Sequence, residues 1–201
     1  MPRKPARRPA ASNQLRIIGG EWRGRKLSFP TIDGLRPTPD RIRETLFNWL
    51  QLDLPGARCL DLFSGSGALG LEALSRGAGE TVLVDRSGEV VRQLEVNLAL
   101  LKAKRVRVEQ DAAQRWLERH QQSGTQFDLV FLDPPFRQGM LEPCCALLEQ
   151  GGLLSDNAMI YIEAEKELRQ LPVPANWIQH RQKSAGQVSC YLYRRGGEVD
   201  G

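Results

Sequence analysis

The fold is decided at residues 59–72, which read CLDLFSGSGALGLE. The residues from Cys59 to Phe63 form a short apolar run of the kind that makes a buried strand. Gly65 and Gly67 then permit a tight turn, and a helical pattern begins at Ala68. A strand that passes through a glycine-rich turn into a helix is typical of open α/β sheets. In such sheets the free N–H groups at the start of the helix face a ligand.

The rest of the chain repeats this alternation. Further apolar runs predict strands at 81–84, 106–108, 127–132 and 158–162. Helical periodicity predicts helices at 68–76, 87–101, 112–121 and 138–149. Trp177–Lys183 and Gln187–Arg194 leave no room for a helix between them, so they predict an antiparallel pair. We therefore predict an α/β, Rossmann-like fold with a mostly parallel seven-stranded sheet that ends in an antiparallel hairpin.

The N-terminal quarter of the chain has a different pattern. Residues 1–13 are rich in Pro, Ala and Arg and predict a disordered basic tail. Leu15–Ile18 and Lys26–Phe29 flank a glycine-containing turn and predict a small hairpin. Thr38 stands where it can cap a helix that begins at Pro39. We expect three parts: the tail, an appendage of hairpin and helix over 14–52, and the Rossmann-like domain over 53–201.

Charge is distributed unevenly between these parts. Residues 1–43 hold 11 Lys and Arg against 3 Asp and Glu, while the remainder holds 17 against 21. A basic arm on a mildly acidic body suits a polyanionic partner, although residues 1–12 could equally be a solubilising tail. We expect phosphate contacts near the active edge from Arg16, Arg23, Arg25, Lys26, Arg36, Arg41 and Arg43. Arg41 or Arg43 could instead pair with the acidic body.

Acidic residues stand at or just after the ends of the first three predicted strands. Asp61 would repel a pyrophosphate but attract an ammonium group, and Asp85 can accept both hydroxyls of a ribose. Asp111 can accept the exocyclic amine of adenine, or it could serve only as a helix cap. These residues predict a nucleoside ligand that carries an ammonium group. The predicted contacts are Asp61, Phe63, Ser64, Gly65, Ser66, Gly67, Asp85, Arg86, Asp111 and Ala112.

The fourth predicted strand leads into Asp133, Pro134, Pro135 and Phe136, which we predict to be catalytic. The prolines have no N–H, so the loop offers acceptors, namely the Asp133 carboxylate and the carbonyl of Pro134. Two acceptors can grip the N–H groups of an aromatic amine and hold its lone pair toward a methyl donor. Phe136 can stack on an extruded base. Catalysis of this kind comes mostly from positioning.

The order of these motifs resembles amino-group methyltransferases of nucleic acids. The flanking segments are similar to the bacterial 16S ribosomal RNA guanine-N2 methyltransferase D family. They are RIIGG at 16–20, WRGR at 22–25, LRPTPDRIRETLFNWL at 35–50 and AGQV at 185–188. The resemblance covers about residues 14–195. It implies a class I fold, S-adenosylmethionine as methyl donor and S-adenosylhomocysteine as product.

The same resemblance implies the substrate. It implies methylation of the exocyclic N2 amine of one guanine, guanine 966, in 16S rRNA. The RNA would lie within an assembled or assembling small ribosomal subunit. We expect a monomer in the cytoplasm that uses no metal and no membrane. The four cysteines support a reducing compartment, because they lie in apolar runs and form no CxxC pair.

Other classes of function explain less of the sequence. The glycine loop alone would suit an NAD-binding oxidoreductase, and the basic arm alone would suit a non-catalytic RNA-binding factor. Neither accounts for Asp133 to Phe136. Among amino methyltransferases, enzymes for DNA adenine usually carry a recognition insertion, for which 201 residues leave no space. Relatives that modify protein glutamine usually have Asn where Asp133 stands.

Overall fold

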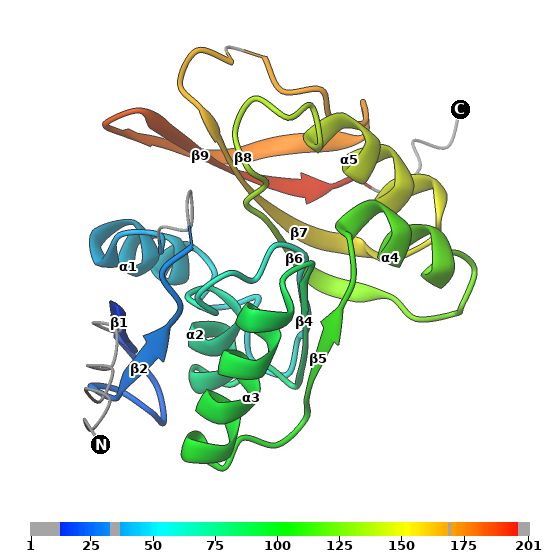
Figure 1. The fold of residues 1–201 in the computed structure, drawn as a ribbon. Coiled ribbons are helices and arrows are strands. Elements are labelled where there is room, and N and C mark those ends of the chain that lie inside the picture. Colours follow the sequence, from blue (N-terminus) through cyan, green and yellow to red (C-terminus); the bar gives the residue numbers. More distant parts are fainter. Residues whose placement is uncertain (1–12, 33–36, 169, 197–201) are drawn as a thin grey trace, which may run out of the picture.

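Seven strands form one twisted sheet in the computed structural model, which describes residues 13–32, 37–168 and 170–196 (Figure 1). The strands are β3 (Arg58–Asp61), β4 (Glu80–Asp85), β5 (Val106–Gln110), β6 (Phe127–Leu132), β7 (Leu154–Glu165), β8 (Trp177–Ala185) and β9 (Val188–Arg195). Their order across the sheet is β5-β4-β3-β6-β7-β9-β8. The first five strands are parallel, and β9 lies antiparallel between β7 and β8. The predicted sheet and its antiparallel hairpin are confirmed.

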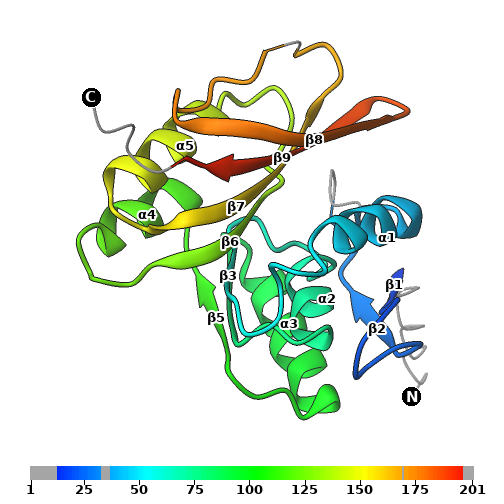
Figure 2. The same cartoon turned by 180° about the vertical axis from the view of Figure 1, so that it is seen from behind.

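Helices cover both faces of the sheet (Figures 1 and 2). One face carries α1 (Asp40–Trp49), α2 (Gly70–Ser75) and α3 (Gly88–Leu101), and the other carries α4 (Ala113–His120) and α5 (Leu141–Gln150). Successive strand residues point to opposite faces, so Leu60 and Val130 pack in the cluster of α4 and α5. Cys59 and Phe131 pack against α1 instead. Among the described residues, no helix is long and apolar enough to cross a membrane.

The predicted N-terminal hairpin is present. Its strands β1 (Asn13–Arg16) and β2 (Lys26–Phe29) pair antiparallel, with Leu15 opposite Leu27. Leu27 is buried in one cluster with Leu94 of α3, and Asn97 of α3 donates a hydrogen bond of 2.9 Å to the carbonyl of Ser28. The hairpin therefore lies against the helical layer (Figure 2). Most of the predicted tail, residues 1–12, lies outside the described residues.

Thr38 does not cap α1, and that prediction is wrong. The residue at the cap position is Pro39, and no side chain accepts a hydrogen bond there. The Thr38 hydroxyl donates instead to Oε1 of Glu163 at 2.6 Å. A hydrogen bond to a buried carboxylate is stronger than one from a backbone N–H group to a neutral hydroxyl, so Thr38 turns to Glu163.

Glu72 connects the hairpin and α1 to α2. Its side chain is fully buried. It accepts hydrogen bonds from the backbone N–H groups of Ile18 and Gly19, both at 2.8 Å. It also forms ion pairs with Arg43 at 3.3 Å and Arg76 at 2.7 Å. One buried carboxylate thus joins its own helix to two segments that are far away in the sequence, and its four donors compensate the cost of its burial.

Candidate active site

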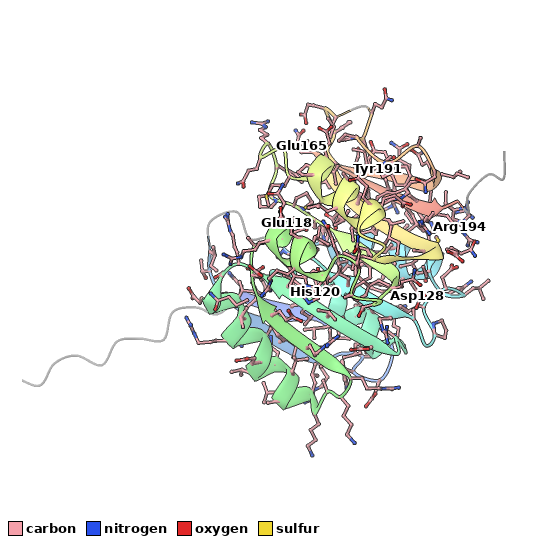
Figure 3. All side chains as sticks on the ribbon, turned by 90° about the vertical axis from the view of Figure 1, so that its right-hand side faces the viewer. Glu118, His120, Asp128, Glu165, Tyr191 and Arg194 are labelled. Carbon is pink, nitrogen blue, oxygen red and sulfur yellow. The ribbon has the colours of Figure 1, made fainter. Side chains whose placement is uncertain are left out.

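Three carboxyl groups gather at the carboxyl edge of the sheet. Asp61 of β3 pairs in register with Phe131 of β6, and Leu132 pairs with Ile162 of β7. Asp133 and Glu163 come next along these two strands, so alternation places them on the same face as Asp61. Asp61, Asp133 and Glu163 interact electrostatically with one another. In Figure 3 the label Glu165 shows where the carboxyl edge lies. Asp128 and Arg194 lie at the opposite edge of the sheet.

The glycine loop is held in shape by its own hydrogen bonds. Gly65 and Gly67 adopt positive φ angles of 48° and 79°. The N–H of Gly67 donates to the carbonyl of Ser64 at 2.7 Å, and the Ser64 hydroxyl donates to the carbonyl of Asp61 at 2.9 Å. The N–H of Gly65 donates to Oδ2 of Asp85 at 2.9 Å. The structure therefore brings the loop and the second strand end together, as the sequence predicts.

Asp61 is a buried carboxyl group without a cation. It is 2% exposed, and its Oδ2 accepts the N–H of Gly70 at 2.9 Å. Burial raises the pKa of Asp61 to about 7, and the charge of Asp85 adds to the effect, while the bond from Gly70 opposes it. No ion pair to Asp61 exists in the described part of the chain. A positively charged group placed here would stabilise the ionised form.

The Asp111 carboxylate already has partners within the protein. Its carboxylate accepts the N–H of Ala112 at 2.8 Å and pairs with Arg115 and Arg119. Burial by itself would raise the pKa of Asp111, but the hydrogen bonds from Arg115 and Ala112 outweigh it and lower the pKa. Asp111 does not cap α4, because Ala112 stands at the cap position and no side chain accepts a hydrogen bond there. The adenine contact stays a prediction.

The loop after β6 borders a cavity of about 530 Å³. Pro134, Pro135 and Phe136 line it on one side, and the end of β7 from Glu163 lines it on the other. Phe136 is 40% exposed. Asp133 accepts no hydrogen bond from the described residues. Burial raises its pKa well above the ordinary value, and the charges of Glu163 and then Asp61 add to this.

Glu163 is a member of the site that we did not predict. It is 5% exposed, and its Oε1 accepts the hydroxyls of Thr38 at 2.6 Å and Tyr161 at 3.0 Å. Burial raises its pKa, and these two hydrogen bonds oppose the rise. A signal was present in the sequence, because Glu163 directly follows the fifth apolar run, as Asp133 directly follows the fourth.

The predicted phosphate contacts differ in their accessibility. Arg43 is fully buried and pairs with Asp40 and Glu72, so the alternative of an ion pair within the protein holds for it, and the predicted phosphate contact is wrong. Arg41 and Lys26 are exposed. Arg16 is also exposed and pairs with Asp40 at 3.3 Å. Arg36 lies outside the described residues.

The turn of the hairpin lies away from the carboxyl edge. Arg23 and Arg25 are exposed there, and Arg25 donates to the carbonyl of Leu100 in the last turn of α3 at 3.2 Å. Because α3 runs back from the end of β4 to the start of β5, its last turn is at the amino edge. Our expectation that these two arginines lie near the active edge is therefore wrong.

The basic surface at the amino edge extends onto the body. A cavity of about 720 Å³ lies between the hairpin turn and the segment after α3. Its basic lining residues are Arg76, Lys102, Lys104 and Arg105. We did not predict this basic extension, because the net charge of the body is negative and a net charge does not reveal a local cluster of basic residues.

The fold and the strand-end carboxylates define a Rossmann-like class I methyltransferase. Two solved structures support this class. A putative methyltransferase from Escherichia coli is 54% identical, with a TM-score of 0.85 over 92% of this chain and 100% of that one. A putative methylase from Haemophilus influenzae is 40% identical, with a TM-score of 0.79 over 92% of this chain and 99% of that one.

Sequence comparison then gives the family. The family model described as "Conserved hypothetical protein 95" matches residues 15–194. Ribosomal RNA small subunit methyltransferase D of E. coli strain K12 is 54% identical over 95% of this chain and 96% of its own length. The H. influenzae protein of that name is 42% identical over 95% of this chain and 99% of its own. The chain belongs to the ribosomal RNA small subunit methyltransferase D family.

Proposed function

We propose that this protein methylates the exocyclic N2 amine of one guanine in 16S rRNA of the small ribosomal subunit. By the family resemblance the base is guanine 966. The methyl donor would be S-adenosylmethionine, the product S-adenosylhomocysteine, and the location the cytoplasm. The observation that carries the proposal is the meeting of Asp61 and Asp133 on one face at the carboxyl edge, next to the glycine loop. The names of the similar E. coli and H. influenzae proteins support the substrate.

The residues at the glycine loop fit the proposed cofactor. Asp61 offers a buried carboxylate without a cation, which suits the ammonium of a methionine moiety. Asp85 stands beside Gly65, where its carboxylate can accept ribose hydroxyls in addition to the backbone N–H. Phe63, Ser64, Ser66, Gly67 and Arg86 stand around the same loop and strand end and complete the proposed contacts. When bound, the cofactor supplies a methyl group activated by a positively charged sulfur.

Asp133 would hold the amine. Its carboxylate has open acceptor positions, and the carbonyl of Pro134 would take the second N–H. The base must leave its stack to reach this edge, and the exposed ring of Phe136 can stack on it. No strong base is required, because the nitrogen becomes acidic as the methyl group arrives. Orientation of the lone pair then supplies most of the rate enhancement.

The exposed arginines and lysine of the appendage would bind RNA phosphates. We keep Arg16, Arg23, Arg25, Lys26 and Arg41 in this role. Such contacts position the enzyme but do not read sequence. The choice of one guanine must then come from the shape of the ribonucleoprotein.

The test is methyl transfer in a purified system. The protein, labelled S-adenosylmethionine and small subunits that lack the modification are mixed, and the rRNA is digested to nucleosides for mass analysis. We expect labelled N2-methylguanosine. Labelled N6-methyladenosine would favour the alternative, an amino methyltransferase for another nucleic-acid amine. No transfer to rRNA in any assembly state would contradict the proposal.

A further inference from the structure

Glu163 stands beside Asp133 with an open acceptor atom. The register pair Leu132–Ile162 precedes the two residues on neighbouring strands, so their side chains leave the same face side by side. The hydroxyls of Thr38 and Tyr161 both donate to Oε1 of Glu163. Within residues 13–32, 37–168 and 170–196, Oε2 accepts no hydrogen bond. Glu163 as a whole is 5% exposed.

The neighbouring carboxyl groups of Asp133 and Glu163 have too few hydrogen-bond donors around them. Neither Asp133 nor Glu163 pairs with a cation in the described part of the chain. The open oxygens of both carboxyl groups keep contact with solvent, so a ligand can reach them, and the two neighbouring carboxyl groups repel each other. A ligand that brings two adjacent N–H donors would give both groups a hydrogen-bond partner and reduce the repulsion. The Watson–Crick edge of guanine presents this pair, namely the N2 amine and N1–H. Adenine presents a bare N1 acceptor next to its amine.

We infer that Glu163 selects the base, with Oε2 accepting N1–H of the target guanine while Asp133 holds its N2 amine. This inference rests on the proposed function and adds a base-recognition residue to it. Thr38 and Tyr161 fix the carboxylate, because both hydroxyls donate to Oε1 and leave Oε2 to face the ligand. An adenine in the same position would set its N1 lone pair against Oε2, which leaves two acceptors facing each other.

The substitution Glu163→Gln tests this directly. An amide keeps an acceptor for Thr38 and Tyr161 but replaces the open acceptor with a donor. The substrates are small subunits reconstituted with 16S rRNA that carries either guanine or 2-aminopurine at the target position. 2-Aminopurine keeps the exocyclic amine, yet its N1 is an acceptor. The measurement is kcat/KM on each substrate for the wild type and for Glu163→Gln.

We expect the wild type to prefer guanine strongly. Glu163→Gln should lower kcat/KM on guanine by about 100-fold or more and should move the preference toward 2-aminopurine. Glu118→Gln makes the same chemical change at an exposed position of α4 and should leave both values unchanged. Retained affinity for S-adenosylhomocysteine shows that the Glu163→Gln protein is folded.

Two results would overturn the inference while the proposed function stands. One is a folded Glu163→Gln protein that keeps the wild-type ratio between the two bases. The other needs no variant: a wild-type enzyme that uses 2-aminopurine as well as guanine has no acceptor that reads N1–H. If the wild type forms no N2-methylguanosine on subunits with guanine, the proposed function itself is contradicted, and the inference fails with it.

Discussion

Replacement of Arg43 by Met removes the charged centre that joins α1 to the hairpin. The guanidinium of Arg43 is fully buried. It pairs with Asp40 at 2.6 Å and Glu72 at 3.3 Å, and it donates to the carbonyls of Arg16 at 2.9 Å and Thr38 at 3.2 Å. Met has a similar length and fills much of the space, so the main change is the loss of charge and of donors.

The size of the effect follows from what remains around Glu72. Its carboxylate keeps the N–H groups of Ile18 and Gly19 and the ion pair with Arg76, but it loses its fully buried partner. Removal of one partner from a buried ion pair costs about 3–5 kcal/mol. A domain is stable by only about 5–15 kcal/mol, so this substitution should remove about a third of the free energy of unfolding.

Urea unfolding followed by circular dichroism measures this loss. With an m-value of about 2–3 kcal/mol/M, the midpoint should fall by about 1–2.5 M. Arg41→Met changes an exposed arginine of the same helix and should alter the free energy of unfolding by less than about 0.5 kcal/mol. If Arg43→Met destabilises the protein no more than Arg41→Met does, Arg43 is not a structural centre and our reasoning is refuted.

Three further predictions concern catalysis, RNA binding and cofactor binding. Asp133→Ala should lower the rate of methyl transfer at least about 100-fold and leave the calorimetric Kd of S-adenosylhomocysteine nearly unchanged. If the variant also loses cofactor affinity, Asp133 has a different role. Arg23→Gln combined with Arg25→Gln should weaken binding to small subunits and reduce the slope of log affinity against log salt by about 1.4–1.8, and an unaltered slope would count against phosphate contacts. Burial raises the pKa of Asp61 to about 7, so the carboxyl of the free protein is mostly protonated at pH 6. Cofactor binding should then release a proton and tighten as the pH rises toward 7, and calorimetry in two buffers should find no such release for Asp61→Asn.

Local patterns located most of the sheet because parallel strands are buried on both faces and read as apolar runs. The predicted strand 127–132 agrees with β6 (Phe127–Leu132) at both ends. The run at 158–162 gave only the centre of β7, which extends from Leu154 to Glu165. Its ends are polar but still pair with neighbours, as Glu165 does with Val188 of β9. Hydrogen bonding to neighbours, which composition does not reveal, extends this strand.

The errors at the site have a common physical origin. Arg43 has the position of a solvent-facing residue in the helical pattern, but its partner Glu72 is 29 residues away. Thr38 has the position of a cap, but its acceptor Glu163 is 125 residues away. Contacts over such separations depend on the tertiary structure. Asp61 and Asp133 could be predicted because the end of a strand is a local feature that already fixes the edge to which they belong.

The bonds around Glu72 have a consequence for substrate choice. Ile18 and Gly19 cannot shift relative to α2 unless several buried bonds break together. The arginines at the hairpin turn are thereby held at a constant separation from the carboxyl edge. If these arginines bind phosphates as proposed, an RNA whose phosphates and target base are spaced differently would not reach the arginines and the carboxyl edge at the same time. Selection of one guanine among many would thus depend on the distance between the bound phosphates and the target base as well as on the chemistry of the base.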